Sequence, residues 1–152
     1  MRKSMVVFMA LALLAASSAA WAATTTVAVS ASVVGTCQVT NTNGAPLVAF
    51  GQLDQVTAPV VNGTVTQPTF WCTKNTAYSI GDDLGANDAA GVYRMTNGTD
   101  FIAYTFTYTA AGPGAGISLP TTMDIAASIP AGTYSDVSAG SYADSILLTI
   151  NP

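Results

Sequence analysis

The sequence contains no histidine and no glutamate, and only four of its 152 residues are lysine or arginine. Without an imidazole there is no general base for a Ser-His-Asp or Cys-His nucleophile. Two cysteines without a histidine cannot form a zinc site unless carboxylates complete it. Nucleic-acid binding requires several Lys or Arg contacts to phosphates, so the scarcity of bases excludes it and also excludes electrostatic attachment to anionic lipid.

Aspartate is the only acidic residue type present. Paired aspartates could in principle perform glycosidase chemistry. We interpret them instead as turn residues, because aspartate is common in turns for its local hydrogen bonds. The sequence therefore predicts a protein that is not an enzyme and that uses no cofactor and no metal.

The first residues have the pattern of an export signal. Arg2 and Lys3 precede an apolar run of 12 residues, 5–16, and Ala20-Trp21-Ala22 then supplies small residues at a cleavage site. The run is shorter than the ~20 residues that span a bilayer, which favours cleavage over an uncleaved anchor, and no cysteine follows it to carry a lipid. We predict a signal peptide over residues 1–22, export, and no membrane anchor after cleavage.

After that cleavage, Lys74 and Arg94 would be the only bases, against eight aspartates. So few charges on so apolar a chain favour a surface that other copies of the protein cover. In an oxidising compartment two cysteines normally pair, so we expect a Cys37–Cys72 disulfide, with free thiols or an intermolecular bridge as the alternatives. The chain-entropy estimate for such a loop is roughly 4 kcal/mol.

Short apolar segments alternate with turn residues along the mature chain, which is typical of a β-sandwich. Residues 92–109 predict a hairpin around Asn97-Gly98, a favoured turn dipeptide. Tyr104, Phe106 and Tyr108 recur at every second residue and so share one face of one strand. We interpret that face as core, although a sugar-stacking platform is the alternative.

Two other motifs have an ordinary structural explanation. Residues 81–91, GDDLGANDAAG, contain oxygen ligands of the kind that calcium prefers, but they lack the regular spacing of a calcium loop and are read as a solvated loop; whether this loop binds an ion stays open. The glycosylation patterns at Asn62-Gly63-Thr64 and Asn97-Gly98-Thr99 both contain Asn-Gly, and we read them as turns.

Residues 24–34, the leading segment, alternate in a way that suits an extended strand. One side of that strand carries Thr25, Val27, Val29, Ala31 and Val33, and the other side is almost wholly small. In a groove of another molecule, three valines would contribute roughly 1.5–3 kcal/mol each and backbone hydrogen bonds ~1 kcal/mol each. Ordering the segment costs ~1–2 kcal/mol per residue. An ordinary first strand in its own sheet is the alternative.

A series of motifs runs in order through the mature chain. They are the alternating segment before Cys37, Cys37 itself, Phe50-Gly51, Cys72-Thr73 with Tyr78 following, Arg94-Met95, Tyr104, and Gly140-Ser-Tyr142-Ala-Asp144 followed by ILLTI. Together they resemble the spore coat protein U domain family, which supplies subunits of archaic (Csu-like) chaperone–usher pili. The tryptophan-glycine element that the family often carries is missing from residues 110–119.

The resemblance implies an all-β fold, an incomplete immunoglobulin-like β-sandwich that a donor strand from a neighbouring subunit completes. Residues 1–22 would be the signal peptide, 23–36 the N-terminal donor-strand segment and 37–152 the pilin domain. The implied site residues are the donor positions Thr25, Val27, Val29, Ala31 and Val33, the groove positions Ile146, Leu148 and Ile150, the final-strand motif Gly140, Tyr142 and Asp144, and the disulfide Cys37–Cys72.

The implied partners are a periplasmic pilus chaperone, an outer-membrane usher, and other copies of the chain or related pilins. The implied function is a structural pilin, exported through the periplasm into surface fibres that support adhesion and biofilm formation. The alternative is a secreted monomeric coat-matrix or carbohydrate-binding β-sandwich domain, whose leading segment would fold into its own sheet.

Overall fold

The computed structural model describes residues 21–40 and 48–152. The chain divides into two units, Met1–Ser32 and Val33–Pro152. In the first unit, the described residues 21–32 form no strand and their side chains are all exposed. The predicted signal peptide lies almost wholly outside the described residues, and the proposed boundaries at residues 22 and 36 stay predictions.

The second unit is built from short strands. They are β1 (Cys37–Val39), β2 (Val48–Ala49), β3 (Val61–Asn62), β4 (Thr64–Val65), β5 (Thr69–Cys72), β6 (Ala77–Asp82), β7 (Arg94–Thr96), β8 (Phe101–Ala103), β9 (Thr105–Thr107), β10 (Ala111–Pro113), β11 (Thr121–Thr122), β12 (Ala126–Ile129) and β13 (Leu148–Asn151). No helix occurs in residues 21–40 or 48–152, so those ranges contain no helix that could span a bilayer. The all-β prediction is confirmed.

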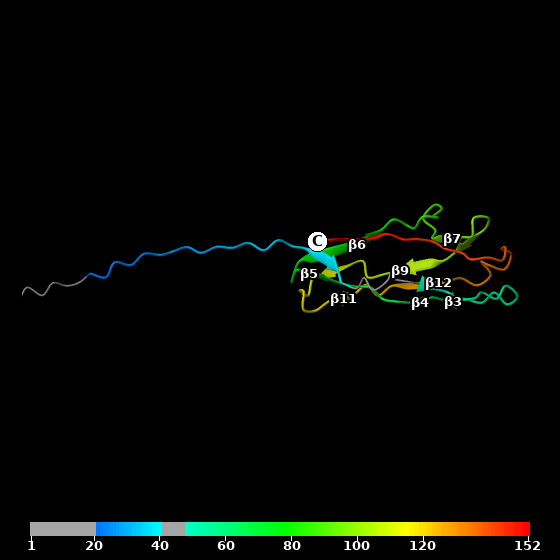
Figure 1. The fold of residues 1–152 in the computed structure, drawn as a ribbon, viewed down its shortest axis with the longest axis horizontal. Helices are drawn as coiled ribbons and strands as arrows, with labels where there is room; N and C mark the ends of the chain where they lie inside the picture. The colour runs from blue at the N-terminus through cyan, green and yellow to red at the C-terminus, as the bar shows by residue number, and fades with distance from the viewer. Residues whose placement is uncertain (1–20, 41–47) are drawn as a thin grey trace, which may run out of the picture. The chain divides into compact units, whose positions relative to one another are not determined.

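All strand pairs are antiparallel, and they form two layers. The sheets β1-β5-β11 and β10-β6-β13 face each other through Phe70 and Tyr78, whose rings meet edge to face at 5.0 Å. Further along, the hairpin β7-β8 packs against the sheet β3-β12-β9 through Met95, Ile102 and Ile129. Figure 1 shows these two halves side by side, with the C-terminus beside β5 and β6.

The hairpin and the aromatic face are confirmed. β7 pairs with β8 in the register Thr96↔Phe101, and the Asn97 side chain closes the turn by accepting the N–H groups of Thr99 and Asp100 at 2.9 and 2.8 Å. Tyr104, Phe106 and Tyr108 are buried or half-buried, whereas the intervening threonines at 105 and 107 are exposed. These three aromatics lie in the core, as a period of two requires.

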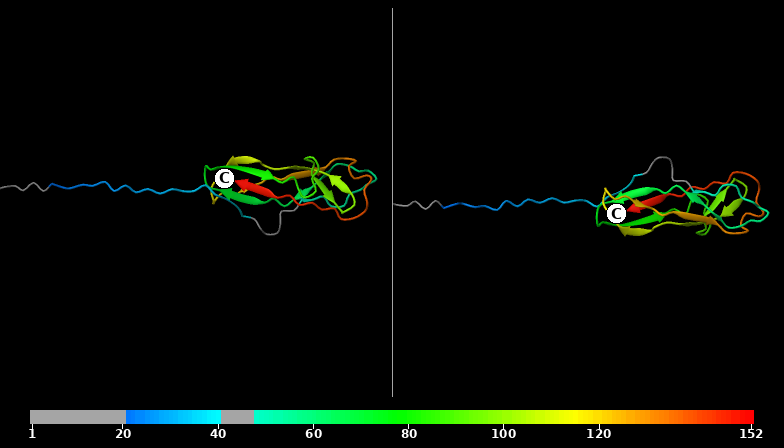
Figure 2. Two further views of the ribbon diagram at one scale, coloured as in Figure 1. Left: turned by 90° about the horizontal axis from the view of Figure 1, so that it is seen from above. Right: turned by 90° about the horizontal axis from the view of Figure 1, so that it is seen from below.

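The final strand is shorter than its sequence suggests. β13 begins at Leu148 and pairs with β6 in the register Ile150↔Ile80, and Figure 2 shows the two strands side by side. Before β13, residues of the 83–87 loop bind backbone groups of residues 145 and 147 that would otherwise be free to pair with a strand. Asp83 accepts the N–H of Leu147 at 2.9 Å, and Ala86 donates to the carbonyl of Ser145 at 2.9 Å. An isolated bridge joins Ala143 to Thr96.

The Cys37–Cys72 disulfide is formed and is confirmed as an intramolecular bond. It joins β1 to β5 at directly opposed positions. Thr73 continues this attachment beyond the sulfurs by donating its N–H to the Thr36 carbonyl at 2.8 Å. The start of the second unit is thus tied to the sheet by one covalent bond and a ladder of hydrogen bonds.

Replacing both cysteines with serine should lower the free energy of unfolding by roughly 2–4 kcal/mol, because the unfolded chain regains the entropy of a 35-residue separation. Chemical unfolding of the oxidised protein, its reduced form and the Cys37→Ser/Cys72→Ser variant measures this. The reduced protein is the control and should match the variant. Equal stability of all three would contradict a structural role.

Candidate functional site

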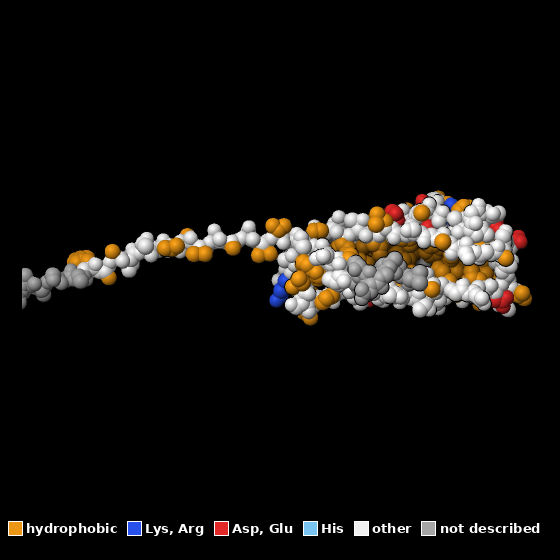
Figure 3. All heavy atoms as spheres, viewed as in Figure 1, with side chains coloured by type: hydrophobic (Ala, Val, Ile, Leu, Met, Phe, Trp, Pro, Cys, Tyr) orange, Lys and Arg blue, Asp and Glu red, His pale blue; other side chains and the backbone are white. Residues whose placement is uncertain are grey.

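A groove with a volume of about 1370 Å³ runs along the second unit. One side, the first rim, is residues 48–55; the other side, the second rim, is residues 137–146 together with Leu148. The groove floor is apolar and aromatic, and its principal side chains are Met95, Ile102, Tyr104, Phe106, Met123 and Ile125. Figure 3 shows the hollow with apolar side chains along its bottom.

The two rims are not paired with each other along most of their length. Gln55 bridges them at one end by donating its Nε2 to the Val137 carbonyl at 2.6 Å. Elsewhere in the described chain, residues 48–54 and 138–148 share no backbone hydrogen bond. β2 pairs with β4, and β13 pairs with β6, on the sides facing away from the groove. The groove therefore has the shape of a sandwich from which one strand is absent.

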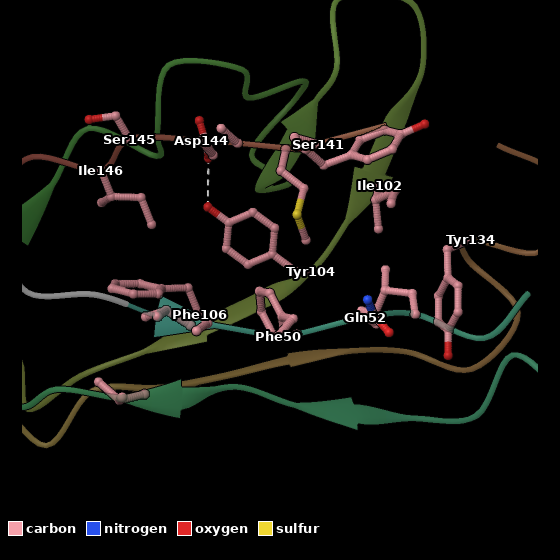
Figure 4. Close-up of a pocket in the computed structure, with 18 of the residues that line it drawn as sticks. Phe50, Gln52, Ile102, Tyr104, Phe106, Tyr134, Ser141, Asp144, Ser145 and Ile146 are labelled. Atoms are coloured by element: carbon pink, nitrogen blue, oxygen red, sulfur yellow. Dashed lines mark hydrogen bonds between the residues drawn. The ribbon is translucent and has the colours of Figure 1, made fainter. Parts of the chain in front are cut away.

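The second rim alternates in burial as an extended chain does. Residues 142, 144, 146, 148 and 150 are half-buried, and the residues between them are exposed. Ile146 and Leu148 line the groove, and Figure 4 shows Ile146 pointing into it, with Ser145 on the opposite side of the chain. Ile150 lies beyond the groove lining and packs against the core around Phe70.

The carboxylate of Asp144 is the polar centre of the groove. The Tyr104 hydroxyl donates to its Oδ2 at 2.6 Å, and Asn87 Nδ2 donates to its Oδ1 at 2.9 Å. Burial raises the pKa of Tyr104 above its ordinary value, and the hydrogen bond to Asp144 raises it further. Figure 4 shows this bond linking the second rim to the floor. Tyr104 is thus held in its neutral, donating form.

The rest of the final-strand motif fixes one end of the second rim. The Tyr142 hydroxyl donates to the Ser138 carbonyl at 2.8 Å and accepts from Asn97 Nδ2 at 3.1 Å. A Cβ added at Gly140 would lie 3.3 Å from the Nδ2 of that same asparagine. The motif Gly140, Tyr142 and Asp144 therefore precedes β13 and attaches its approach to the β7-β8 hairpin and to the floor.

Sequence reasoning did not identify the first rim or most of the floor. Phe50 packs on Tyr104 with ring centroids 6.0 Å apart, yet in the sequence it appeared only as part of a motif. Met123 and Ile125 are 3% and 5% exposed. They alternate along the chain as buried strand residues do, and this alternation is the sequence signal that could have identified them.

The leading segment carries apolar side chains that its own unit does not cover. Val27 is 77% exposed, Val29 is 91% exposed and Val33 is 85% exposed. Thr25 and Ala31, which alternate with them, are exposed as well. Among the described residues, the leading segment and the groove are thus two exposed apolar features of the same chain.

Comparison with known proteins gives a family match. Residues 23–149 match the family described as Spore Coat Protein U domain. A search of curated proteins finds no match.

A chain in the crystal structure of the CsuC-CsuE chaperone-tip adhesion subunit pre-assembly complex, from archaic chaperone-usher Csu pili of Acinetobacter baumannii, is similar at a TM-score of 0.46 and 17% identity. The match covers 78% of this chain and 40% of that chain.

Replacing Tyr104 with Phe should lower the free energy of unfolding by about 1–3 kcal/mol, because Asp144 loses a hydrogen-bond donor. Because the pKa of Tyr104 is raised in the folded state, its contribution to the free energy of unfolding depends on pH. That contribution is complete below the ordinary tyrosine pKa of about 10 and declines as the pH rises above it. The midpoint temperature of thermal unfolding, followed by circular dichroism, should therefore fall more steeply above pH ~10 in the original chain than in Tyr104→Phe. Identical alkaline slopes would argue against this role.

Proposed function

The chain belongs to the Spore Coat Protein U domain family, and from that premise we propose that it is a structural pilin subunit. Its leading segment, residues 24–34, enters the groove of a neighbouring copy and supplies the absent strand. Repetition of this exchange makes a surface fibre for adhesion and biofilm formation. The observation that carries the proposal is the groove itself: its floor is apolar, and among the described residues its two rims share no backbone hydrogen bond.

The energetics favour an extended apolar occupant. Each valine of the leading segment that becomes buried contributes roughly 1.5–3 kcal/mol, and each new backbone hydrogen bond adds ~1 kcal/mol. These gains offset an ordering cost of ~1–2 kcal/mol per residue. Adding a strand to an open sheet edge is an established way for proteins to bind extended segments, and the alternation of the leading segment suits it.

The exchange also accounts for the partners. An exposed strand edge above an apolar floor promotes aggregation, so a subunit in transit needs a periplasmic chaperone that covers the groove. The leading segment and the groove are different surfaces, so the contact between copies is heterologous and extends into a filament. An outer-membrane usher would then release the growing fibre to the cell surface. In this role the protein performs no catalysis.

Substituting inward and outward positions of the leading segment tests the proposal. Val29→Asp places a charge in the apolar groove and should abolish surface fibres, whereas Ser30→Asp, one residue along on the other face, should retain them. Deletion of residues 24–34 should give the same loss as Val29→Asp while a chaperone-bound subunit still accumulates. Electron microscopy of the producing cells measures the surface fibres, and immunoblots of periplasmic fractions measure the chaperone-bound subunit.

A secreted monomeric domain predicts a different result. Such a domain would remain soluble and uncomplexed when its full mature chain is purified, and Val29→Asp would change its stability without any effect on fibres. Finding that monomer, and no fibres on cells that express the unaltered chain, would reject the pilin proposal.

A further inference from the structure

The backbone of the leading segment is free of hydrogen bonds over most of its length. Among the described residues, no hydrogen bond involves positions 24–33, and none of these positions lies in a strand. The exposed fractions of Val27, Val29, Val33 and Val34 lie between 77% and 91%. Exposed chain without secondary structure is where proteases preferentially cut.

The side chains of this region are all small. Residues 23–36 consist of alanine, threonine, valine, serine and glycine alone. They include no lysine or arginine for a trypsin-like protease, and no aromatic residue, leucine or methionine for a chymotrypsin-like one. The residue before the cleaved bond must fit the S1 pocket of the protease, and this pocket is small in elastase. The composition therefore matches the elastase type and excludes the other two.

We propose that the leading segment is a cleavage site for elastase-type serine proteases, which cut it between Val27 and Ser32 and leave the second unit intact. Hydrolysis breaks one backbone C–N bond. The serine oxygen of the protease bonds to the carbonyl carbon, and the serine proton leaves with the amine. Water then gives its hydroxyl to the carbonyl carbon and returns a proton to the serine, so water is the only reactant consumed.

The attachment of residues 34–36 sets the end of the cleavable region. A protease must bind the backbone of its substrate as an extended strand on both sides of the bond that it cuts. The Thr73 hydroxyl donates to the Val34 carbonyl at 3.4 Å, and the Thr73 N–H donates to the Thr36 carbonyl at 2.8 Å. Gly35 packs so closely on Thr76 that an added Cβ would lie 2.9 Å from its Cγ2. Residues from 34 onward are therefore occupied, which places the cut earlier in the segment.

Other stretches of small residues are held within the second unit. In residues 110–116, Gly114 donates its N–H to the Thr76 carbonyl at 2.7 Å. In residues 130–138, the side chain of Tyr134 is completely buried. These stretches must unfold locally before they can enter a protease active site, whereas the leading segment needs no unfolding. The leading segment is therefore cut first.

Cleavage would leave a subunit that can accept a strand but cannot donate one, and this consequence rests on the proposed function. The two rims and the floor of the groove all belong to the second unit, so the groove survives the loss of residues 23–31. The groove and the leading segment are different surfaces, so a chaperone that covers the groove leaves the leading segment exposed. A neighbour's groove would cover it in the fibre. The subunit is thus cleavable before assembly and resistant afterwards.

Limited proteolysis of the full mature chain in periplasmic extracts tests the cleavage site. Pancreatic elastase should remove the start of the chain and give a stable product whose first residue lies between 28 and 32, as measured by mass spectrometry. Trypsin and chymotrypsin at matched activity should leave residues 23–36 attached. An intact leading segment after elastase treatment, or an earlier cut within the second unit, would overturn the proposal.

Two lysine variants separate the effect of backbone conformation from that of side-chain exposure. Ser30 and Ser79 are both exposed, but Ser79 lies in β6 and is paired with Ala111 and Asn151. Ser30→Lys should make trypsin cut the chain after residue 30, whereas Ser79→Lys should give no cut after residue 79. Equally fast cutting of the two variants would show that exposure alone decides, and would overturn the argument from conformation.

Surface fibres distinguish this proposal from the proposed function. Elastase should not shorten the subunit in intact fibres from the unaltered chain. If it shortens fibres and periplasmic chain alike, the cleavage site stands and the burial of the leading segment in a neighbour fails. If the periplasmic chain resists elastase while fibres form, the cleavage site fails and the proposed function stands. Resistance in the periplasm together with no fibres would reject both.

Discussion

One carboxylate joins three parts of the chain around the groove. Asp144 belongs to the second rim, Tyr104 rises from the floor to bond it, and Asn87 reaches it from the 81–91 loop. Among the described residues, no strand pairs with the second rim on the groove side. The hydrogen bonds of this carboxylate therefore fix the position of the rim relative to the floor, as strand pairing would do elsewhere. The Arg94 side chain extends the network by donating to the Asn87 carbonyl at 3.1 Å.

This anchoring explains how a sandwich with an unpaired interior edge can keep a defined shape. Aromatic side chains pack on one another from the first rim into the core below the floor, from Phe50 through Tyr104 and Tyr93 to Phe106. Close-packed rings resist collapse of the two rims onto each other. In the proposed exchange between copies, a groove that is already formed would lower the ordering cost of binding the incoming strand.

The sequence predicted those features that depend on local patterns. The alternation of Tyr104, Phe106 and Tyr108, the turn at Asn97-Gly98 and the pairing of two cysteines all follow from spacing or chemistry within short stretches. The first rim was not predicted, because its contact with the floor joins residues far apart in the chain. Residues 140–144 were expected to belong to the final strand, but the strand begins only at Leu148. Asp83 and Ala86 bind the backbone before it, which alternation alone cannot reveal.

The position of the disulfide has a mechanical consequence. In a fibre of the proposed kind, each leading segment is held in one subunit and continues into the next at Cys37, so any pull along the fibre reaches the second subunit at that residue. Cys37 is bonded to Cys72 in the centre of the sheet β1-β5-β11. The disulfide therefore transmits tension from β1 to the central strand β5, and it prevents β1 from separating from the sheet one residue at a time. Under load, the weakest point becomes the strand held in the groove.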